Sequence, residues 1–354
     1  MAHRLALALV SLGLVALGGC GGPPASTSAP ATGPAPATSA PAPAPTGATA
    51  EAGAAPRATD KVVISVPGPS LSYLPAKVAD EKGFFRDEGL DIEWTTLGGD
   101  LSISAILSGN VDYTTIPSSA SAAAAQGAPV RTVLFMSVKL QHTLVARPDL
   151  ASVQDLAGKR IGVQRQGDLT AFESKRVMDL FHVPDVNIVT VGGDTQRLAA
   201  LESGAVDAIV ASAPWDLKAE QDGMHVLLAI GSVLEIPQAG LATSLEKINR
   251  DGDEIAALVR GIIRGTRYVQ DPAHHDEVAA LIADWVGMSQ EEAASALDRV
   301  RDTYSPAALP TNTQMQLYLE MLRATGAASD TTTVDQITDF GIARRVAAEQ
   351  GVAP

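Results

Sequence analysis

The chain of 354 residues contains a single cysteine, Cys20. One cysteine excludes an intrachain disulfide, a thiolate metal site and a cysteine-based catalytic centre in the folded part of the chain. Aromatic residues make up only 4% of the sequence, and 26 basic residues face 40 acidic ones, a formal net charge of −14. Such an acidic surface argues against nucleic-acid binding and against a polybasic contact with a membrane.

An apolar run from Leu5 to Leu17 follows Arg4 at the N-terminus. The run is shorter than the roughly 20 residues of a membrane-spanning helix and is typical of a secretory signal. It ends in Leu17-Gly18-Gly19-Cys20, which resembles the bacterial lipobox, where signal peptidase cuts before the cysteine and the sulfur carries a diacylglycerol. We expect residues 1–19 to be a lipoprotein signal peptide and Cys20 to be lipidated. The alternative is a secreted protein with an ordinary cleavage site and an incidental cysteine.

Residues 21–58 are mostly Pro, Ala, Thr, Ser and Gly, with almost no bulky apolar side chains. A segment of this composition cannot bury enough surface to fold. Its prolines favour extended conformers, so it reaches on the order of 100 Å. We interpret residues 20–59 as the acylated cysteine and a disordered tether.

One sequence pattern occurs twice in the rest of the chain. Gly98-Gly99-Asp100 is followed by an apolar run, Ser108-Gly109 and Val111-Asp112; Gly192-Gly193-Asp194 is followed by a similar run, Ser203-Gly204 and Val206-Asp207. A largely β-branched run precedes each copy, at residues 92–97 and 186–191. The copies lie 94 positions apart, beyond the roughly 20 to 50 residues of a solenoid repeat. The repeat therefore predicts two similar lobes.

Each copy predicts a strand, a turn, a helix and a second strand. The β-branched run is a buried parallel strand, the glycines allow a sharp turn, and the aspartate is placed to cap the helix. One face of the helices is apolar, and Ser-Gly ends each of them. The residues of these faces are Ile103, Ile106 and Leu107 in the first helix and Leu198 and Leu201 in the second. Open α/β sheets built from such units bind ligands beyond the carboxyl ends of their strands.

The first lobe is expected to begin with a strand at 61–66, a loop at 67–73 and a helix over 76–82. The second lobe repeats this order, with a strand at 160–163, a loop at 164–168 and a helix over 171–181. We expect lobe 1 to begin at 60–147, lobe 2 to span 148–238 and the chain to return to lobe 1 over 239–354. The strand-like pieces at 142–147 and 239–243 are candidates for the two hinge crossings, the alternative being ordinary edge strands. Helical spacing dominates after Thr243, and we expect these helices to pack on lobe 1. The last is expected to carry Ile337, Phe340, Ala343 and Ala347 on one face.

Several short motifs together resemble one family. They are Lys82-Gly83-Phe84-Phe85, Glu88-Gly89-Leu90-Asp91, Leu107-Ser108-Gly109 with Val111-Asp112, the run 155–163, and Ser203-Gly204-Ala205-Val206-Asp207. The chain is similar, over roughly residues 61–271, to the SsuA/TauA-like group of periplasmic binding proteins, which serve transporters of nitrate, sulfonates, taurine or thiamine precursors. The resemblance implies an α/β, two-lobed periplasmic-binding-protein-like (type II) fold with extra C-terminal helices.

The same resemblance implies a function. We expect an extracytoplasmic solute-binding lipoprotein of an ABC importer, monomeric, anchored to the cell membrane, and working with permease and ATPase subunits. It would capture a small polar organic solute, either sulfonate-, nitrate- or taurine-like or pyrimidine-like, by hinge closure. A solute sensor that presents its ligand to a membrane receptor and a lipid-anchored enzyme are the alternatives.

Loop positions predict the ligand site. In lobe 1 the candidates are Ser70, Ser72, Tyr73, Gly99, Asp100, Ser118 and Ser119; in lobe 2 they are Arg165, Gln166, Gly167, Asp168, Gly193, Asp194, Ser212 and Trp215. Free N–H groups at helix N-termini suit an oxyanion. The aspartates either cap helices or face the cleft, where one would hold an amine or an aminopyrimidine. Tyr73 and Trp215 either stack on a planar ligand or are buried in their own lobes.

No enzyme motif stands out in the sequence. A Gly-x-Ser-x-Gly elbow at a strand end, a phosphate loop and a Gly-x-Gly-x-x-Gly loop are absent. His274-His275-Asp276 is a poor metal site, because adjacent residues of a helix do not face one point. We therefore expect no catalytic activity, no cofactor and no metal. Lys139 and His142 lie at or just before the first crossing and are further candidates for ligand contact, the alternative for Lys139 being a solvated side chain.

Overall fold

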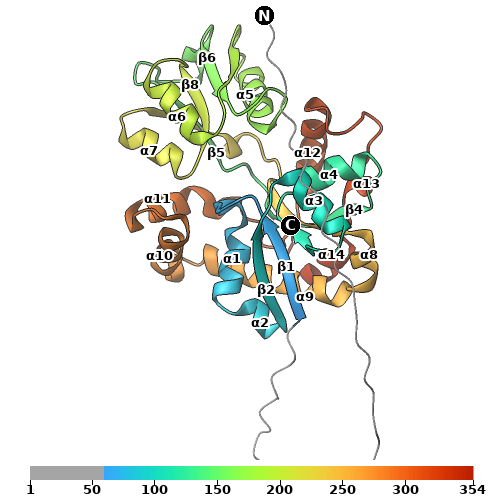
Figure 1. Cartoon of the computed structure of the whole chain (residues 1–354). Helices are drawn as coiled ribbons and strands as arrows, with labels where there is room; N and C mark the ends of the chain where they lie inside the picture. The colour runs from blue at the N-terminus through green and yellow to red at the C-terminus, as the bar shows by residue number, and fades with distance from the viewer. Residues whose placement is uncertain (1–59, 354) are drawn as a thin grey trace, which may run out of the picture. The chain divides into compact units, whose positions relative to one another are not determined.

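The computed structural model describes residues 60–353. The expected signal peptide, Cys20 and the tether lie outside the described residues. Ten strands form two five-stranded sheets in this part of the chain (Figure 1). We use lobe 1 for the first sheet with its helices and lobe 2 for the second.

The first sheet has the order β2-β1-β3-β10-β4, with β1 at Asp60–Val66, β2 at Leu90–Thr96, β3 at Tyr113–Thr114, β4 at Val130–Ser137 and β10 at Ala239–Ser244. Strand β1 runs parallel to β2 and β3, and β10 runs antiparallel to β3 and β4. Val62 and Ile64 of β1 are fully buried, as expected for the β-branched run predicted there.

The second sheet repeats this arrangement with the order β7-β6-β8-β5-β9. Its strands are β5 at His142–Ala146, β6 at Arg160–Val163, β7 at Asn187–Thr190, β8 at Ala208–Ser212 and β9 at His225–Ala229. Strand β6 is parallel to β7 and β8, and β5 is antiparallel to β8 and β9. The predicted pair of similar α/β units is confirmed.

The crossings between the sheets differ from the expected ones. Each candidate hinge is a strand with a partner on both sides: β5 lies between β8 and β9, and β10 between β3 and β4. The chain passes from one sheet to the other at residues 138–141 and 230–238. Residues 142–147, which we expected in lobe 1, therefore begin the second sheet.

The helices of lobe 1 come from both ends of the described chain. The 3-10 turn η1 (Leu71–Tyr73) precedes α1 (Leu74–Glu81), α2 (Phe84–Asp87), α3 (Gly99–Leu107) and α4 (Pro117–Ala125). After β10 come α8 (Leu245–Arg250), α9 (Gly252–Gln270), η4 (Pro272–His274), α10 (His275–Val286), α11 (Gln290–Val300), η5 (Arg301–Thr303), α12 (Asn312–Ala324), α13 (Val334–Ile337) and α14 (Gly341–Glu349). Helix α9 packs on α1, α2 and α14.

Lobe 2 carries α5 (Leu169–Leu180), α6 (Asp194–Glu202) and α7 (Trp215–Gln221), with short 3-10 turns at η2 (Val153–Leu156) and η3 (Ile230–Ser232). Helix α6 packs on β8 and β6, and α7 packs on β5, β8 and β9. Among the described helices, none is both long and apolar enough to cross a membrane.

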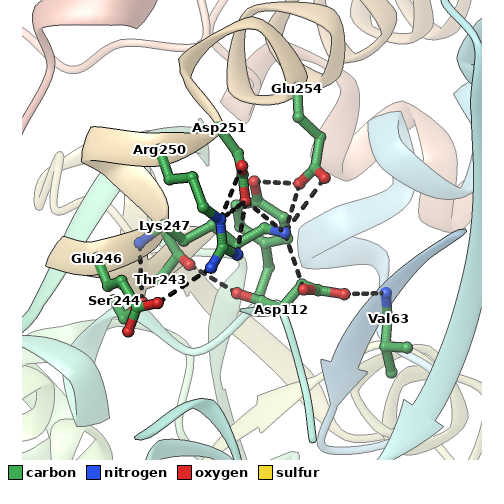
Figure 2. A network of polar contacts seen from close by, with 10 residues as sticks. Val63, Asp112, Thr243, Ser244, Glu246, Lys247, Arg250, Asp251 and Glu254 are labelled. Atoms are coloured by element: carbon green, nitrogen blue, oxygen red, sulfur yellow. Dashed lines mark hydrogen bonds and ion pairs between the residues drawn. The ribbon is translucent and has the colours of Figure 1, made fainter. Parts of the chain in front are cut away.

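The repeated Val-Asp pair joins strands in the same way in both lobes. The Asp112 carboxylate accepts the amide N–H of Val63 at 2.8 Å, and the Asp207 carboxylate accepts the amide N–H of Arg160 at 2.9 Å. Each aspartate returns a backbone hydrogen bond to the same residue. Figure 2 shows Asp112 between Val63 and Lys247. The repeated Val-Asp pair therefore has a structural role: in each sheet its aspartate links two neighbouring parallel strands.

Three local predictions were wrong. Leu107 is 48% exposed, although Ile103 and Ile106 are buried, because α3 ends at Leu107 and the chain turns away. Asp100 and Asp194 do not cap their helices, since the N-cap residues are Gly98 and Gly193. The expected last helix is divided into α13 and α14, because the chain is extended at Thr338.

Candidate ligand site

The loops of lobe 1 meet at the carboxyl ends of β1 and β2. Ser70 caps η1, where its Oγ accepts the Ser72 amide and lies 2.9 Å from the Ser72 hydroxyl. A Cβ on Gly99 would lie 2.2 Å from Oγ of Ser119, so a larger residue would force the Ser119 hydroxyl to move; the loop after β2 and the start of α4 approach closely here. The structure thus brings these two candidates together.

Two further candidates of lobe 1 stand at the starts of helices. Asp100 lies exposed in the first turn of α3, and its carboxylate makes no hydrogen bond within residues 60–353. Ser118 lies partly buried in the first turn of α4, next to Ser119. Both positions carry polar groups that remain available to a solute.

Tyr73 lies in an aromatic cluster of its own lobe. Its ring is stacked on Trp94 with centroids 6.0 Å apart and meets Trp285 edge-on at 5.3 Å. The Tyr73 hydroxyl donates to the carbonyl of Gly68, and burial raises the pKa of this side chain. The residue is only 3% exposed, so its stacking partners are tryptophans. A pocket between these rings and Pro69 opens beside the loop after β1.

The loop after β6 in lobe 2 is held by its own side chains. Asp168 caps α5, accepting the Ala171 amide at 3.0 Å and the Thr170 hydroxyl at 2.8 Å. The Gln166 side chain donates to the carbonyl of Ile188 at 2.7 Å. Arg165, Gln166 and Gly167 are exposed. The cap engages one oxygen of the Asp168 carboxylate, and the Arg165 side chain is exposed beside it.

A buried arginine organises the loops after β7 and β8. Arg197 of α6 is 2% exposed; its Nε donates to the Val210 carbonyl and its Nη1 to the Gly192 carbonyl. Its Nη2 donates to Asp194 at 2.6 Å, and the same carboxylate accepts the amide and the hydroxyl of Ser212, both at 3.2 Å. Asp194 and Ser212 are therefore brought together, and the negative charge of Asp194 is matched.

Two other candidates in lobe 2 take different positions. Gly193 is exposed and is the N-cap residue of α6, directly before Asp194. Trp215 is partly buried and packs on the apolar cluster formed by α6, β8 and their neighbours. Packing within its own lobe was the alternative interpretation of Trp215.

One buried acid–base pair escaped the sequence analysis. Nδ1 of His142 lies 2.8 Å from both carboxylate oxygens of Glu173, which is fully buried on α5. Burial lowers the pKa of His142, but the charges of Glu173 and Asp194 outweigh it and leave this pKa raised. His142 stands opposite Ser212 in the β5–β8 ladder. The one sequence signal for this pair is Glu173 itself, an acidic residue among the buried positions of α5.

The lobes also contact each other through charged side chains. Arg299 of α11 pairs with Asp216 of α7 at 3.0 Å and with Glu220, and Asp216 is 2% exposed. Lys139, at the first crossing, pairs with Glu235 of the second at 2.8 Å. The Arg299 contacts therefore join α11 to α7, and the Lys139–Glu235 pair joins the two crossings.

Two five-stranded sheets joined by reciprocal crossings define the periplasmic binding protein fold. The chain belongs to the NMT1/THI5-like family, whose model matches residues 71–274. This confirms the family resemblance of the sequence motifs.

The chain is also similar to three known proteins. The Bacillus subtilis protein named "Putative binding protein YtlA" is 24% identical over 305 residues, covering 82% of this chain and 91% of that protein. The alkanesulfonate-binding protein SsuA from Xanthomonas axonopodis pv. citri, bound to MOPS, is 18% identical, with a TM-score of 0.60, over 80% of this chain and 98% of that one. The desulfurization enzyme DSZB is 15% identical, with a TM-score of 0.61, over 82% and 99% of the two chains. The two structures establish the shared fold.

Proposed function

We propose that the chain is an extracytoplasmic solute-binding protein of an ABC importer. One observation carries this proposal: the chain crosses between the two sheets only by short connections within residues 60–353. The crossing at 138–141 leads into β5, and the crossing at 230–238 leads into β10, each an inner antiparallel strand of its sheet. Two short connections of this kind permit hinge motion of one lobe against the other. The family assignment and the likeness to SsuA support the same function.

Solute capture would use the polar loops at the carboxyl edges of both sheets. Ser118 and Ser119 of lobe 1 and Asp194 and Ser212 of lobe 2 are the groups we assign to solute contact. A solute bridging them favours the closed form, because only that form makes both sets of contacts. Micromolar affinity corresponds to about 8 kcal/mol, part of which offsets the cost of closure.

The charges at these loops support a small polar organic solute with an oxyanion. Asp168 is engaged in a cap, and Arg197 matches the charge of Asp194. Free helix N–H groups at α4 favour negative charge. Asp100 alone keeps an exposed, unmatched carboxylate among the three candidate aspartates, which suits a solute that also carries an amine, such as a taurine-like molecule.

The bound solute can be identified by native mass spectrometry of protein purified from its own host. A co-purifying small molecule should appear as a discrete mass increment that is released on unfolding. Incubation of that molecule with the protein should return it unchanged. Chemical conversion would instead favour an enzyme, a role that DSZB shows to be compatible with this fold. The unchanged solute together with a receptor partner in place of a permease would favour the sensor.

We also propose that Cys20 carries the lipid that holds the protein at the membrane. The sequence Leu17-Gly18-Gly19-Cys20 supports this proposal. Metabolic labelling with a fatty acid analogue should label the wild type and leave Cys20→Ser unlabelled. Equal labelling of both proteins would contradict lipidation at this position.

A further inference from the structure

His142 stands where a solute contact in lobe 2 is expected. It is the first residue of β5, directly after the crossing at 138–141, and it pairs in register with Ser212 at the carboxyl end of β8. The neighbouring loop contributes Asp194, which accepts the Ser212 hydroxyl. His142 thus belongs to the sheet edge that carries the proposed solute contacts.

Glu173 fixes the orientation of the His142 ring. Both oxygens of its buried carboxylate lie 2.8 Å from Nδ1, and a carboxylate only accepts, so Nδ1 carries a proton. Nε2 makes no hydrogen bond within residues 60–353, and 13% of the His142 side chain is exposed. The ring therefore offers its second nitrogen to a group from outside the lobe.

The charges around the ring are balanced only when it is protonated. Glu173 faces it from α5, and Asp194 and Arg197 influence it from α6. Arg197 matches Asp194, so an imidazolium is needed to match Glu173. A neutral ring leaves one excess negative charge at the sheet edge, which would repel an anion and attract an amine.

We propose that His142 is a ligand-binding and specificity-determining residue of lobe 2, whose imidazolium Nε2–H donates to an oxyanion of the solute. This rests on the proposed function and narrows the solute to one carrying a sulfonate or a similar oxyanion next to lobe 2. Charge-assisted hydrogen bonds of this kind are roughly twice as strong as neutral ones.

The proposal predicts a particular dependence on pH. A sulfonate keeps its charge from pH 5 to 9, so any change in affinity reports on the protein. The affinity should be constant below the pKa of His142 and fall toward tenfold per pH unit above it, because the ring must then take up a proton to bind. Glu173→Gln should move this decline to lower pH, since it removes the charge that favours imidazolium. His142→Gln should abolish the decline.

The test is an NMR titration of the histidine Cε1–H signals of the full-length protein with methanesulfonate, nitrate and sulfate, each from pH 5 to 9. The His142 signal is assigned by its loss in His142→Gln. Methanesulfonamide, which is uncharged, is the ligand control. His225→Gln is the matched control variant, because His225 lies opposite Ala146, at the other end of β5, and its ring contacts the carbonyl of Leu150.

The expected result is that at least one anion shifts the His142 signal and raises its pKa, while methanesulfonamide does neither and His225→Gln binds like wild type. The proposal is overturned if no anion moves the His142 signal, or if methanesulfonamide moves it equally. A solute that compacts the protein without perturbing His142 would leave the binding function standing and reject this role. Failure of the protein to carry or bind any solute would instead reject the proposed function.

Discussion

Removing the charge of Asp207 should destabilise lobe 2 in a manner that depends on pH. Asp207 is 5% exposed and accepts hydrogen bonds from the backbone and the guanidinium of Arg160, with Arg147 also nearby. Hydrogen bonding to Arg160 lowers the pKa of Asp207 to about 2, burial opposes this shift, and the charges of both arginines add to it. The variant Asp207→Asn keeps the size of the side chain, removes its charge and replaces one of the two acceptor oxygens with a donor NH2 group.

The pKa shift sets the magnitude of the effect. A fall from 3.8 to about 2 corresponds to roughly 2.4 kcal/mol at about 1.4 kcal/mol per pH unit. The Arg160 side chain is 41% exposed, and solvent screening reduces this value to about 1–2 kcal/mol. Because the folded pKa is depressed, the contribution is present above the unfolded pKa near pH 4 and is lost as the pH falls through about 2.

Urea unfolding of wild type and Asp207→Asn from pH 7 to pH 3 measures this difference. We expect the variant to be less stable by about 1–2 kcal/mol at pH 7, with about half of the difference lost by pH 3. Asp149→Asn is the control, because Asp149 is 64% exposed and also pairs with Arg147, so its loss should cost less than about 0.5 kcal/mol. The reasoning would be refuted if wild type and Asp207→Asn were equally stable at pH 7. It would also be refuted if the difference in their free energies of unfolding stayed constant from pH 7 to pH 3.

Two further substitutions test the packing that positions the site. Gly240→Ala should cost at least about 2 kcal/mol in urea unfolding, since the new Cβ would lie 2.1 Å from the carbonyl oxygen of Leu134; a smaller loss would mean that β10 and β4 can separate. Arg299→Met should cost about 2–4 kcal/mol, because the buried carboxylate of Asp216 loses its cation. Arg301→Met should have little effect, since Arg301 meets carboxylates only at 3.9 Å, and equal losses in the two arginine variants would contradict the role of the pair.

Much of the fold was accessible from local patterns. The β-branched run at 61–66 and the run 160–163 became β1 and β6, because a buried parallel strand leaves a continuous apolar signature. The glycines after Ser108 and Ser203 both adopt a positive φ at the helix ends, as their position predicted. The repeat indicated two similar sheets, because each copy encodes one complete strand–helix–strand unit.

The crossings and the His142–Glu173 pair were not accessible in this way. Whether a short apolar segment forms a strand with neighbours on both sides depends on strands far away in the chain. The segments that form β5 and β10 were therefore interpreted as hinge crossings. Glu173 lies 31 residues from His142 in sequence, and helical spacing alone does not show which buried polar group it meets. The sequence also could not show that Arg197, one turn into α6, matches Asp194 and donates to the carbonyls of Gly192 and Val210.

The central claim is that a solute draws the two lobes together across the crossings at 138–141 and 230–238. Small-angle X-ray scattering of the purified protein, with and without the molecule found by native mass spectrometry, tests it most directly. We predict a smaller radius of gyration at saturating solute. The size of this decrease should be the same at every protein concentration. An unchanged radius of gyration, for a solute shown to be bound in the same sample, would contradict closure as the mechanism of capture.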